Sequence, residues 1–418
     1  MSEWKEYKFS DFVEINPNVT LPSDECISYV EMKDLNESEK FCFPSSERKK
    51  GNGSKFQNYD TLFARITPCL ENGKICQVRG LKNNVGLGST EFIVFRGKRN
   101  VSDTDFIFYL SRWDDVRSHA EINLDGTSGR QRVPIACFDD LIIKMPVDID
   151  EQKAIASILS SLDDKIDLLH RQNATLEKMA ETLFRQWFVE EDNDDTISQL
   201  ISIQNGYAFK SKDFRENGIH GVIKIKNISD GIIDIEKTDF IENEIAKSAQ
   251  ERFKIRTGDI LIAMTGAEIG KLGIIPKTNK NLWLNQRVGL LKEKFRGSKY
   301  LAYLQLKSEF GQDYIENTAT GSAQPNISGT GIENCGFPKL SEKQIKEYSY
   351  QIGELFEKVI FNLGQIKTLT ELRNMLLPKL MSGEIRVESH RDETSVETNN
   401  DTATLSPVGA AFKTIKHG

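Results

Sequence analysis

The sequence lacks the features that mark several classes of protein. No apolar run approaches the ~20 residues that a helix needs to cross a bilayer, so we expect no membrane segment. The N-terminus, Met1–Lys5, has no apolar core like that of a signal peptide, which predicts a cytoplasmic protein. The six cysteines form no C-x-x-C pair and the five histidines are scattered. We therefore expect reduced thiols rather than a disulfide framework, and no zinc site.

Motifs for catalysis are also missing. The chain has no G-x-x-x-x-G-K-[ST] phosphate loop, no G-x-G-x-x-G after a predicted strand, and no N-P-P-Y or D-P-P-Y motif of an adenine-methylating pocket. Asp24 with Glu31 and Lys33 fits a metal-nuclease pattern loosely, but Lys224 takes the place of Glu31 in the second half. The sequence therefore predicts no catalytic residue, no metal and no cofactor in this chain.

The sequence contains an internal repeat, and matching segments of the two copies lie about 190 to 200 residues apart. Such a period is far longer than the 20–50 residues of solenoid repeats, so it indicates a duplicated domain. The matching pairs are 29–35 with 222–228, 60–64 with 259–263, 106–110 with 300–304, and 126–128 with 321–323.

Each copy combines strand-like and helical segments, which predicts an α+β fold. We expect the first domain over 1–146 and the second over 191–338. Short runs of alternating polarity between glycine-rich breaks predict the strands, and Asp103 is a plausible N-cap of the first helix. The predicted strands are 27–30, 61–64, 92–95 and 141–144, then 222–225, 260–263 and 288–291; the predicted helices are 103–116 and 298–310.

A long helix with a heptad pattern follows each domain, over 147–190 and 339–384. The apolar positions alternate by four and three, which is typical of a coiled-coil seam. The first helix carries Ile155, Leu162, Leu169, Leu176 and Leu183 with Leu159, Ile166, Asn173, Ala180 and Trp187; the second carries Ile345, Ile352, Val359 and Ile366 with Tyr348, Leu355, Asn362, Leu369 and Leu376.

Two such helices in one chain most simply pack on each other. The second helix must return from the second domain, so the pair is predicted to be antiparallel. The span from Ile155 to Trp187 predicts a spacer of roughly 50 Å at ~1.5 Å per residue. That length is about one and a half turns of B-DNA.

One asparagine interrupts each seam near its middle, Asn173 in the first helix and Asn362 in the second. In an antiparallel pair related by the repeat, the two side chains are predicted to meet. A buried seam asparagine costs stability but specifies register. The alternative is that each faces water at a bulge.

The charge is unevenly distributed. Residues 147–195 carry 5 basic and 13 acidic side chains, whereas 196–340 carry 20 basic and 16 acidic ones, so the net charge of −7 does not exclude a basic face on the repeated domains. Polar loops with lysine, arginine and amide side chains are candidates for phosphate and base contacts, although each could be an ordinary surface turn. The candidates are Arg48, Lys49, Lys50, Lys55, Arg65, Thr127, Ser128, Arg130, Gln131 and Arg132 in the first domain, and Asn285, Gln286, Arg287, Ser322, Gln324 and Asn326 in the second.

With these features the chain resembles the specificity (S) subunit of type I restriction–modification enzymes. The residues that carry the resemblance are 151–159 (EQKAIASIL) after Pro146, 183–189 (LFRQWFV), and 376–385 (LLPKLMSGEI). The resemblance covers about residues 4–387. It implies two pseudo-symmetric α+β target recognition domains joined by a two-helix antiparallel coiled coil, each domain reading one half of a gapped site on double-stranded DNA.

The resemblance also implies partners. Two methyltransferase (M) subunits would dock on the helices and carry S-adenosylmethionine, and motor-nuclease (R) subunits would bring ATP- and Mg²⁺-dependent cleavage, in the cytoplasm of a bacterium or archaeon. Trp187, Phe188, Leu377 and Leu380 at the helix ends are candidates for partner contact, or else they complete the chain's own core. Residues 388–418 extend past the usual end of the family, and the composition of the tail 385–418 favours disorder.

Two other interpretations remain open at this stage. The chain could be a coiled-coil scaffold whose end domains bind proteins, or a stand-alone DNA methyltransferase or nuclease, which the missing motifs disfavour.

Overall fold

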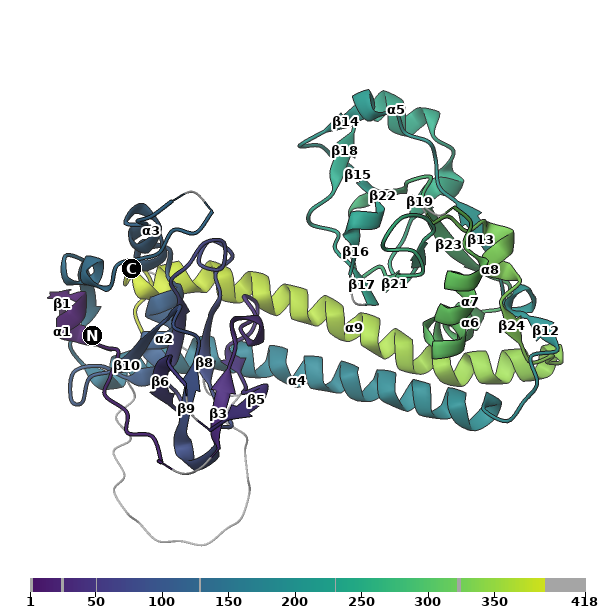
Figure 1. Ribbon diagram of the computed structural model, residues 1–418. Helices are drawn as coiled ribbons and strands as arrows, with labels where there is room; N and C mark the ends of the chain where they lie inside the picture. The colour runs from purple at the N-terminus through teal and green to yellow at the C-terminus, as the bar shows by residue number, and fades with distance from the viewer. Residues whose placement is uncertain are drawn as a thin grey trace, which may run out of the picture. The chain divides into compact units, whose positions relative to one another are not determined.

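The computed structural model describes residues 3–23, 26–49, 51–127, 129–229, 231–321 and 325–387. The chain divides into two compact units: residues 1–167 with 368–418 form unit 1, and residues 168–367 form unit 2. Each unit holds one mixed domain and a segment of both long helices, α4 (Ile149–Phe188) and α9 (Glu342–Met381), drawn in teal and yellow-green in Figure 1. Among the described helices, none is both long and apolar enough to span a membrane.

Unit 1 is built on two sheets, ordered β2-β10-β7-β8-β4 and β5-β3-β9-β6, beside a β1-β11 pair. The strands are β1 (Trp4–Lys8), β2 (Val13–Ile15), β3 (Ile27–Val30), β4 (Phe41–Cys42), β5 (Ser46–Arg48), β6 (Ser54–Gln57), β7 (Thr61–Ala64), β8 (Ile75–Val78), β9 (Val85–Gly88), β10 (Phe92–Gly97) and β11 (Ile142–Pro146). The helices besides α4 and α9 are α1 (Phe9–Phe12), α2 (Thr104–Arg112) and α3 (Asp114–Ile122).

An aromatic cluster forms the core of unit 1. The ring of Phe138 lies 5.1, 5.9 and 5.2 Å from the rings of Phe9, Phe63 and Phe95. Because these phenylalanines come from α1, β7, β10 and the turn before β11, their burial fixes the five-stranded sheet against the rest of the unit. Leu380 of α9 is buried in the same cluster, which ties the end of that helix to the domain.

Unit 2 repeats this plan with extra strands. Its sheets are ordered β13-β23-β20-β21-β17-β16 and β14-β18-β15-β22-β19, beside a β12-β24 pair. The strands are β12 (Asp195–Thr196), β13 (Ile201–Asn205), β14 (Phe214–Arg215), β15 (His220–Ile223), β16 (Ile228–Ser229), β17 (Gly231–Ile233), β18 (Asp239–Ile241), β19 (Lys254–Ile255), β20 (Ile260–Ala263), β21 (Leu272–Ile274), β22 (Asn281–Leu284), β23 (Val288–Glu293) and β24 (Gly336–Phe337). The helices are α5 (Asn243–Ser248), α6 (Ser298–Lys307), α7 (Glu309–Thr318) and α8 (Gly329–Glu333).

The two helices predicted at 103–116 and 298–310 are each broken into two, at Trp113 and at Ser308. Both residues have extended backbone, with φ/ψ of −66°/139° and −64°/160°. The hydroxyl of Ser308 caps α7 by accepting from Gly311 N at 3.1 Å. A Cβ at Gly311 would lie 2.1 Å from Gln305 O, so only glycine fits this tight junction. Asp103 is the N-cap of α2, as predicted, and accepts from Phe106 N at 3.0 Å.

The strand predicted at 222–225 is also corrected, because β15 ends at Ile223. The side chain of Asn227 accepts from Lys224 N at 2.9 Å and closes a 3₁₀ turn there. In unit 1, Asp34 accepts from Glu31 N at 2.7 Å and closes the same turn after β3. The repeated segment is therefore a strand followed by a capped turn in both units.

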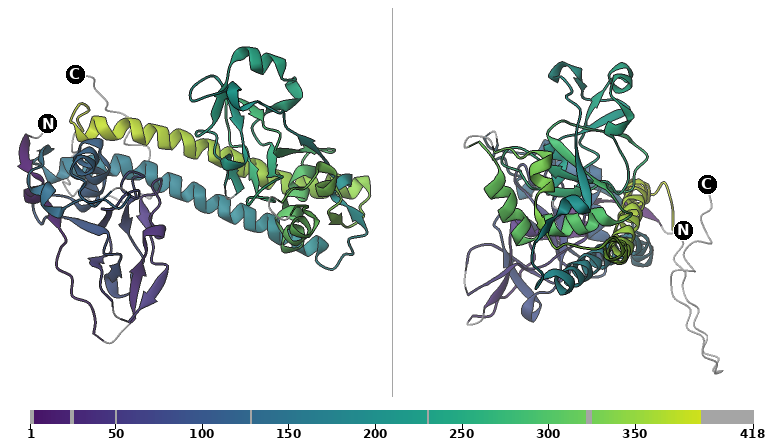
Figure 2. Two further views of the ribbon diagram at one scale, coloured as in Figure 1. Left: turned by 45° about the horizontal axis from the view of Figure 1, so that its top comes forward. Right: turned by 90° about the vertical axis from the view of Figure 1, so that its right-hand side faces the viewer.

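Segments of α4 and α9 pack antiparallel within each unit, and in both views of Figure 2 they lie side by side. In unit 1, Arg373 Nη1 donates to Asp163 Oδ1 at 2.6 Å, while Arg386, just beyond α9, donates to Glu151 at 2.9 Å near the start of α4. In unit 2, Trp187 stacks on Tyr348 with ring centroids 4.5 Å apart.

The two seam asparagines meet inside unit 2. Asn362 Nδ2 donates to Asn173 Oδ1 at 2.9 Å, and both residues are buried. The contact predicted from the heptad pattern is thus present. Asn173 Nδ2 and Asn362 Oδ1 have no hydrogen-bond partner among the described residues, so the pair is only partly satisfied.

Candidate nucleic-acid interface

Three loops of unit 1 meet at the end of β7. Val133 N donates to Arg65 O at 2.8 Å, and Thr67 N donates to Gln131 O at 3.0 Å. On the other side, Arg65 N donates to Glu91 O at 3.0 Å. We call the loops 65–67 and 89–91, together with residues 125–127 and 129–133 of the third loop, the triple-loop site of unit 1. Main-chain hydrogen bonds, with one from Gln131 N to Thr67 Oγ1 at 3.1 Å, hold these loops together, so their folding depends mainly on the main chain rather than on side chains.

Unit 2 builds the same arrangement at the end of β20. Ile327 N donates to Met264 O at 3.0 Å, Gly266 N donates to Pro325 O at 2.9 Å, and Met264 N donates to Arg287 O at 3.1 Å. The loops 264–266 and 285–287, with residues 320–321 and 325–327, therefore form the triple-loop site of unit 2.

The matching bridges extend through the third loop. Arg132 pairs with both Ile66 and Asp125, and Asn326 pairs with both Thr265 and Thr320. Because the hydrogen-bond pattern is the same, Arg132 and Asn326 occupy one equivalent position in the two units.

Most of the predicted site residues lie in these two sites. Unit 1 brings together Arg65, Thr127, Arg130, Gln131 and Arg132, while unit 2 brings together Asn285, Gln286, Arg287 and Asn326. The predicted Ser128, Ser322 and Gln324 lie outside the described residues.

One loop of unit 1 was missed by the sequence reasoning. Ser89, Thr90 and Glu91 occupy the place of Asn285, Gln286 and Arg287, because each loop precedes the long strand of its sheet and makes the same turn. Glu91 N donates to Ser89 Oγ at 3.2 Å, and Arg287 N donates to Asn285 Oδ1 at 3.4 Å. Only an alignment through the following strand could have found this match, since the three residue pairs share no identity.

Polar groups that point to a ligand occur in the site of unit 1. Arg132 Nε donates to both carboxylate oxygens of Glu91 at 2.9 Å, and Nη2 donates to Oε1 at 2.7 Å. The carboxylate raises the pKa of the Arg132 guanidinium, which therefore stays charged. Arg65 Nε is buried and has no hydrogen-bond partner among the described residues. A guanidinium left partly unsatisfied can donate to a bound anion or base edge.

The predicted cationic loop 48–55 is divided by the structure. Arg48 ends β5 and Lys55 lies in β6, which are opposite edges of one four-stranded sheet. Arg48 lies over the ring of Tyr29 at 3.5 Å and within 3.5 Å of Glu31, so its charge is partly engaged. Lys49 and Lys55 are exposed. Lys50 lies outside the described residues.

The four apolar residues proposed for partner contact fall into two groups. Phe188 and Leu380 are buried, at 8% and 1% exposure, in the cores of their own units, so the contact assignment is corrected for them. Their burial stabilises this chain itself. Trp187 and Leu377 are only partly buried, so they keep some surface for a partner.

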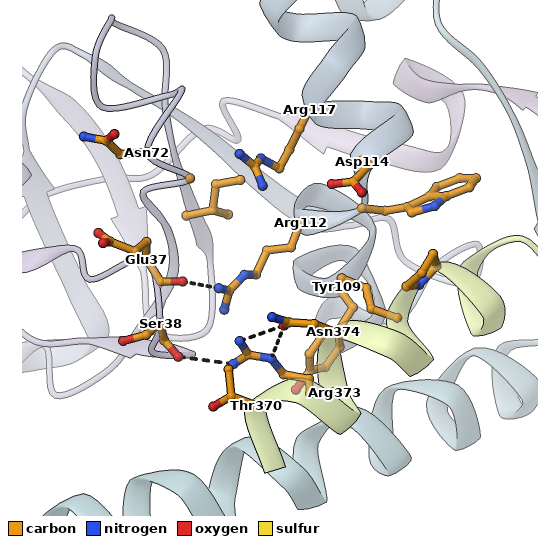
Figure 3. Close-up of a pocket in the computed structure, with 15 residues that line it drawn as sticks. Glu37, Ser38, Asn72, Tyr109, Arg112, Asp114, Arg117, Thr370, Arg373 and Asn374 are labelled. Atoms are coloured by element: carbon orange, nitrogen blue, oxygen red, sulfur yellow. Dashed lines mark hydrogen bonds between the residues drawn. The ribbon is translucent and has the colours of Figure 1, made fainter. Parts of the chain in front are cut away.

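Leu377 lines a pocket of about 450 Å³ in unit 1, shown in Figure 3. Arginines from three helices, Arg112, Arg117 and Arg373, also line it. Arg373 is paired with Asp163, whereas Arg112 donates to the carbonyl oxygens of Glu37 and Glu39. Burial lowers the pKa of Arg112, and the positive charge of Arg373 lowers it further.

Unit 2 has a pocket of about 600 Å³ at the matching place, between α6–α7 and the end of α4. Phe184, Arg185, Lys307 and Glu309 are among its lining residues. The pockets therefore pair the same kinds of element in the two units but differ in charge. Among the residues that the structure describes, no three His, Cys, Asp or Glu side chains cluster closely enough to hold a metal ion.

The chain is similar to several specificity subunits of type I restriction enzymes. The type I restriction enzyme HindI specificity subunit of Haemophilus influenzae is 25% identical, over 92% of this chain and 100% of that protein. The EcoAI specificity subunit of Escherichia coli is 29% identical, over 85% of this chain and 77% of that protein. The MjaVIII specificity subunit of Methanocaldococcus jannaschii is 24% identical, over 73% of this chain and 75% of that protein.

Among solved structures, the S subunit of a type I restriction–modification system from M. genitalium shares the fold. The TM-score is 0.53 at 16% identity, and the match covers 91% of this chain and 96% of that one. The family model described as the type I restriction modification DNA specificity domain matches twice, over residues 1–178 and 191–358. Since these two matches together span most of the chain, it belongs to the family of type I restriction–modification specificity subunits, which recognise DNA sequence.

Proposed function

We propose that this chain is the non-catalytic subunit that selects the target of a type I restriction–modification complex, with each unit reading one half of a gapped DNA site. The observation that carries the proposal is the triple-loop site, which is built twice on the same main-chain hydrogen bonds but with different side chains. Two loops with the same main-chain structure but different side chains can contact two half-sites of different sequence on one duplex.

The partners follow from the family resemblance. Two methyltransferase subunits dock on the segments of α4 and α9, near Trp187 in unit 2 and Leu377 in unit 1. S-adenosylmethionine belongs to those subunits, and ATP and Mg²⁺ belong to the motor-nuclease subunits that join for cleavage. The complex works in the cytoplasm of a bacterium or archaeon.

Methylation mapping tests the proposal directly. The chain is co-expressed with a type I methyltransferase subunit from the same organism in a host without other adenine methylation, and the host genome is mapped. We expect one gapped two-part motif with a methylated adenine. Gln131→Ala should relax the motif in one half and Asn326→Ala in the other; loss of both halves in either variant would contradict independent readers.

The scaffold alternative predicts a different result. A protein-binding scaffold has no reason to bind duplex DNA with a steep salt dependence. For a DNA reader, the logarithm of the binding constant should fall linearly with the logarithm of salt concentration, with a slope that indicates several phosphate contacts. A flat slope together with no methylated motif would favour the scaffold.

A further inference from the structure

Two equivalent positions in the triple-loop sites carry different side chains in the two units. The first position is Glu91 in unit 1 and Arg287 in unit 2. The main-chain carbonyl of this residue accepts a hydrogen bond from the first N–H after β7 or β20. The second is the doubly bridged residue, which is Arg132 in unit 1 and Asn326 in unit 2. The main-chain hydrogen bonds at these positions match in the two units, whereas the side chains differ.

In unit 1, the glutamate holds the arginine by one side of its guanidinium. All three hydrogen bonds to Glu91 use Nε and Nη2 of Arg132, at 2.7 to 2.9 Å. The end of the guanidinium, formed by Nη1 and the outer hydrogen of Nη2, has no partner among the described residues. The Arg132 side chain is 47% exposed while Glu91 is 21% exposed, so the carboxylate supports the arginine from the protein side.

The free end of such a guanidinium matches one base. Two parallel N–H groups fit the O6 and N7 acceptors of guanine in the major groove, and this is the commonest specific arginine contact. A carboxylate on the other edge restricts the rotamers of the arginine and aims it before DNA arrives, which lowers the entropy cost of binding.

In unit 2, the equivalent position offers an amide instead. Asn326 is exposed, and its side chain makes no hydrogen bond to any described residue. A carboxamide pairs with N6 and N7 of adenine. The position that Glu91 holds in unit 1 is taken by Arg287, which has no carboxylate partner among the described residues and is suited to a phosphate.

We infer that Arg132, aimed by Glu91 as a positioning residue, reads a guanine in the half-site of unit 1, and that Asn326 reads an adenine at the corresponding place in the half-site of unit 2. The inference rests on the proposed function, because it assumes that each triple-loop site faces a DNA major groove.

The test uses the complex of the full chain with its methyltransferase subunit. Sites carrying every base at each motif position are methylated in competition and then sequenced. In the wild-type motif we expect a guanine at one position of one half-site. Arg132→Lys keeps the positive charge but removes the two parallel N–H groups of the guanidinium. It should therefore reduce the preference for that guanine by roughly 10- to 100-fold.

Glu91→Gln separates positioning from folding. It should reduce the same preference by about tenfold, leave the other half-site unchanged, and leave non-specific DNA binding equal or stronger because a negative charge is removed. A merely structural role would instead lower the thermal stability and weaken specific and non-specific binding together. Glu6→Gln, an exposed residue of β1 with the same change in charge, is the matched control and should change nothing.

A transplant gives the strongest test. Arg287→Glu combined with Asn326→Arg places the pair of unit 1 on the frame of unit 2. The preferred base at one position of the second half-site should then change from adenine to guanine. An unchanged adenine in the double variant, or a wild-type half-site without the guanine, would overturn the inference.

The two levels of failure can be told apart. If the wild-type complex methylates a two-part motif but these variants leave its bases unchanged, the assignment of readers is wrong and the proposed function stands. If the wild-type complex yields no gapped motif, the proposed function itself fails.

Discussion

Replacing the buried asparagine pair with leucine should separate the cost of a lone polar group from the cost of the pair. In Asn362→Leu, the carboxamide of Asn173 stays buried and loses the one side-chain partner that it has among the described residues. An unsatisfied buried group costs about 1–3 kcal/mol, and the added apolar contact offsets part of that cost. We expect each single variant to lose about 1 kcal/mol of unfolding free energy.

The double variant should behave in the opposite way. Asn173→Leu with Asn362→Leu removes both amides, including Asn173 Nδ2 and Asn362 Oδ1, which have no partner among the described residues. Replacing both partners of a buried polar pair by apolar groups is often stabilising. We expect a gain of about 1 kcal/mol over the wild type, which gives a coupling free energy of about 3 kcal/mol for the pair.

Differential scanning calorimetry measures these changes. For a unit of this size, ~1 kcal/mol shifts Tm by about 2–4 °C, down for each single variant and up for the double variant. Gln172→Leu makes a similar substitution at the exposed neighbour of Asn173 and should change Tm little. Additive effects, with the double variant less stable than either single one, would refute the reasoning, because they would mean that the two amides do not depend on each other.

Three further predictions concern charged groups. Asp163→Asn leaves the buried guanidinium of Arg373 without its carboxylate, so urea denaturation should show a loss of about 3 kcal/mol. Burial raises the pKa of Asp259 above its ordinary value, so the stability that this group contributes is present below about pH 4 and is lost as pH rises through the raised pKa. The unfolding free energy of Asp259→Asn relative to that of the wild type should therefore be higher at pH 7 than at pH 4, as measured by urea denaturation at both pH values. Lys55→Ala should lower the salt slope of DNA binding by about 1 if the lysine contacts one phosphate, with base preference unchanged.

The sequence predicted those parts of the fold that depend on long, regular patterns. The heptads placed both long helices and the contact between Asn173 and Asn362, because seam positions repeat over many turns. The breaks at Trp113 and Ser308 were not predicted, since they depend on local capping and on the close approach of Gly311 to Gln305. Such contacts leave no periodic trace in a sequence.

The sequence predicted only some of the residues of the candidate site. Arg132 and Asn326 lie in loops that the repeat brought into alignment, so both were predicted. Glu91 was not predicted, because the residue that takes its place in unit 2 is the dissimilar Arg287. In addition, Arg132, to which Glu91 is bonded, lies 41 residues away along the chain. Its role depends on a pairing through space that only the folded chain reveals.

The main-chain bonds that close each triple-loop site have a consequence for how such proteins diversify. The atoms that keep the loops folded are mainly carbonyls and amide N–H groups common to nearly every amino acid, with few side-chain bonds such as the one that Thr67 Oγ1 accepts from Gln131 N. Selection for a new target and selection for a stable subunit therefore act on largely separate atoms. We therefore expect that a few substitutions in these loops can change the recognised sequence at little cost to the stability of the subunit.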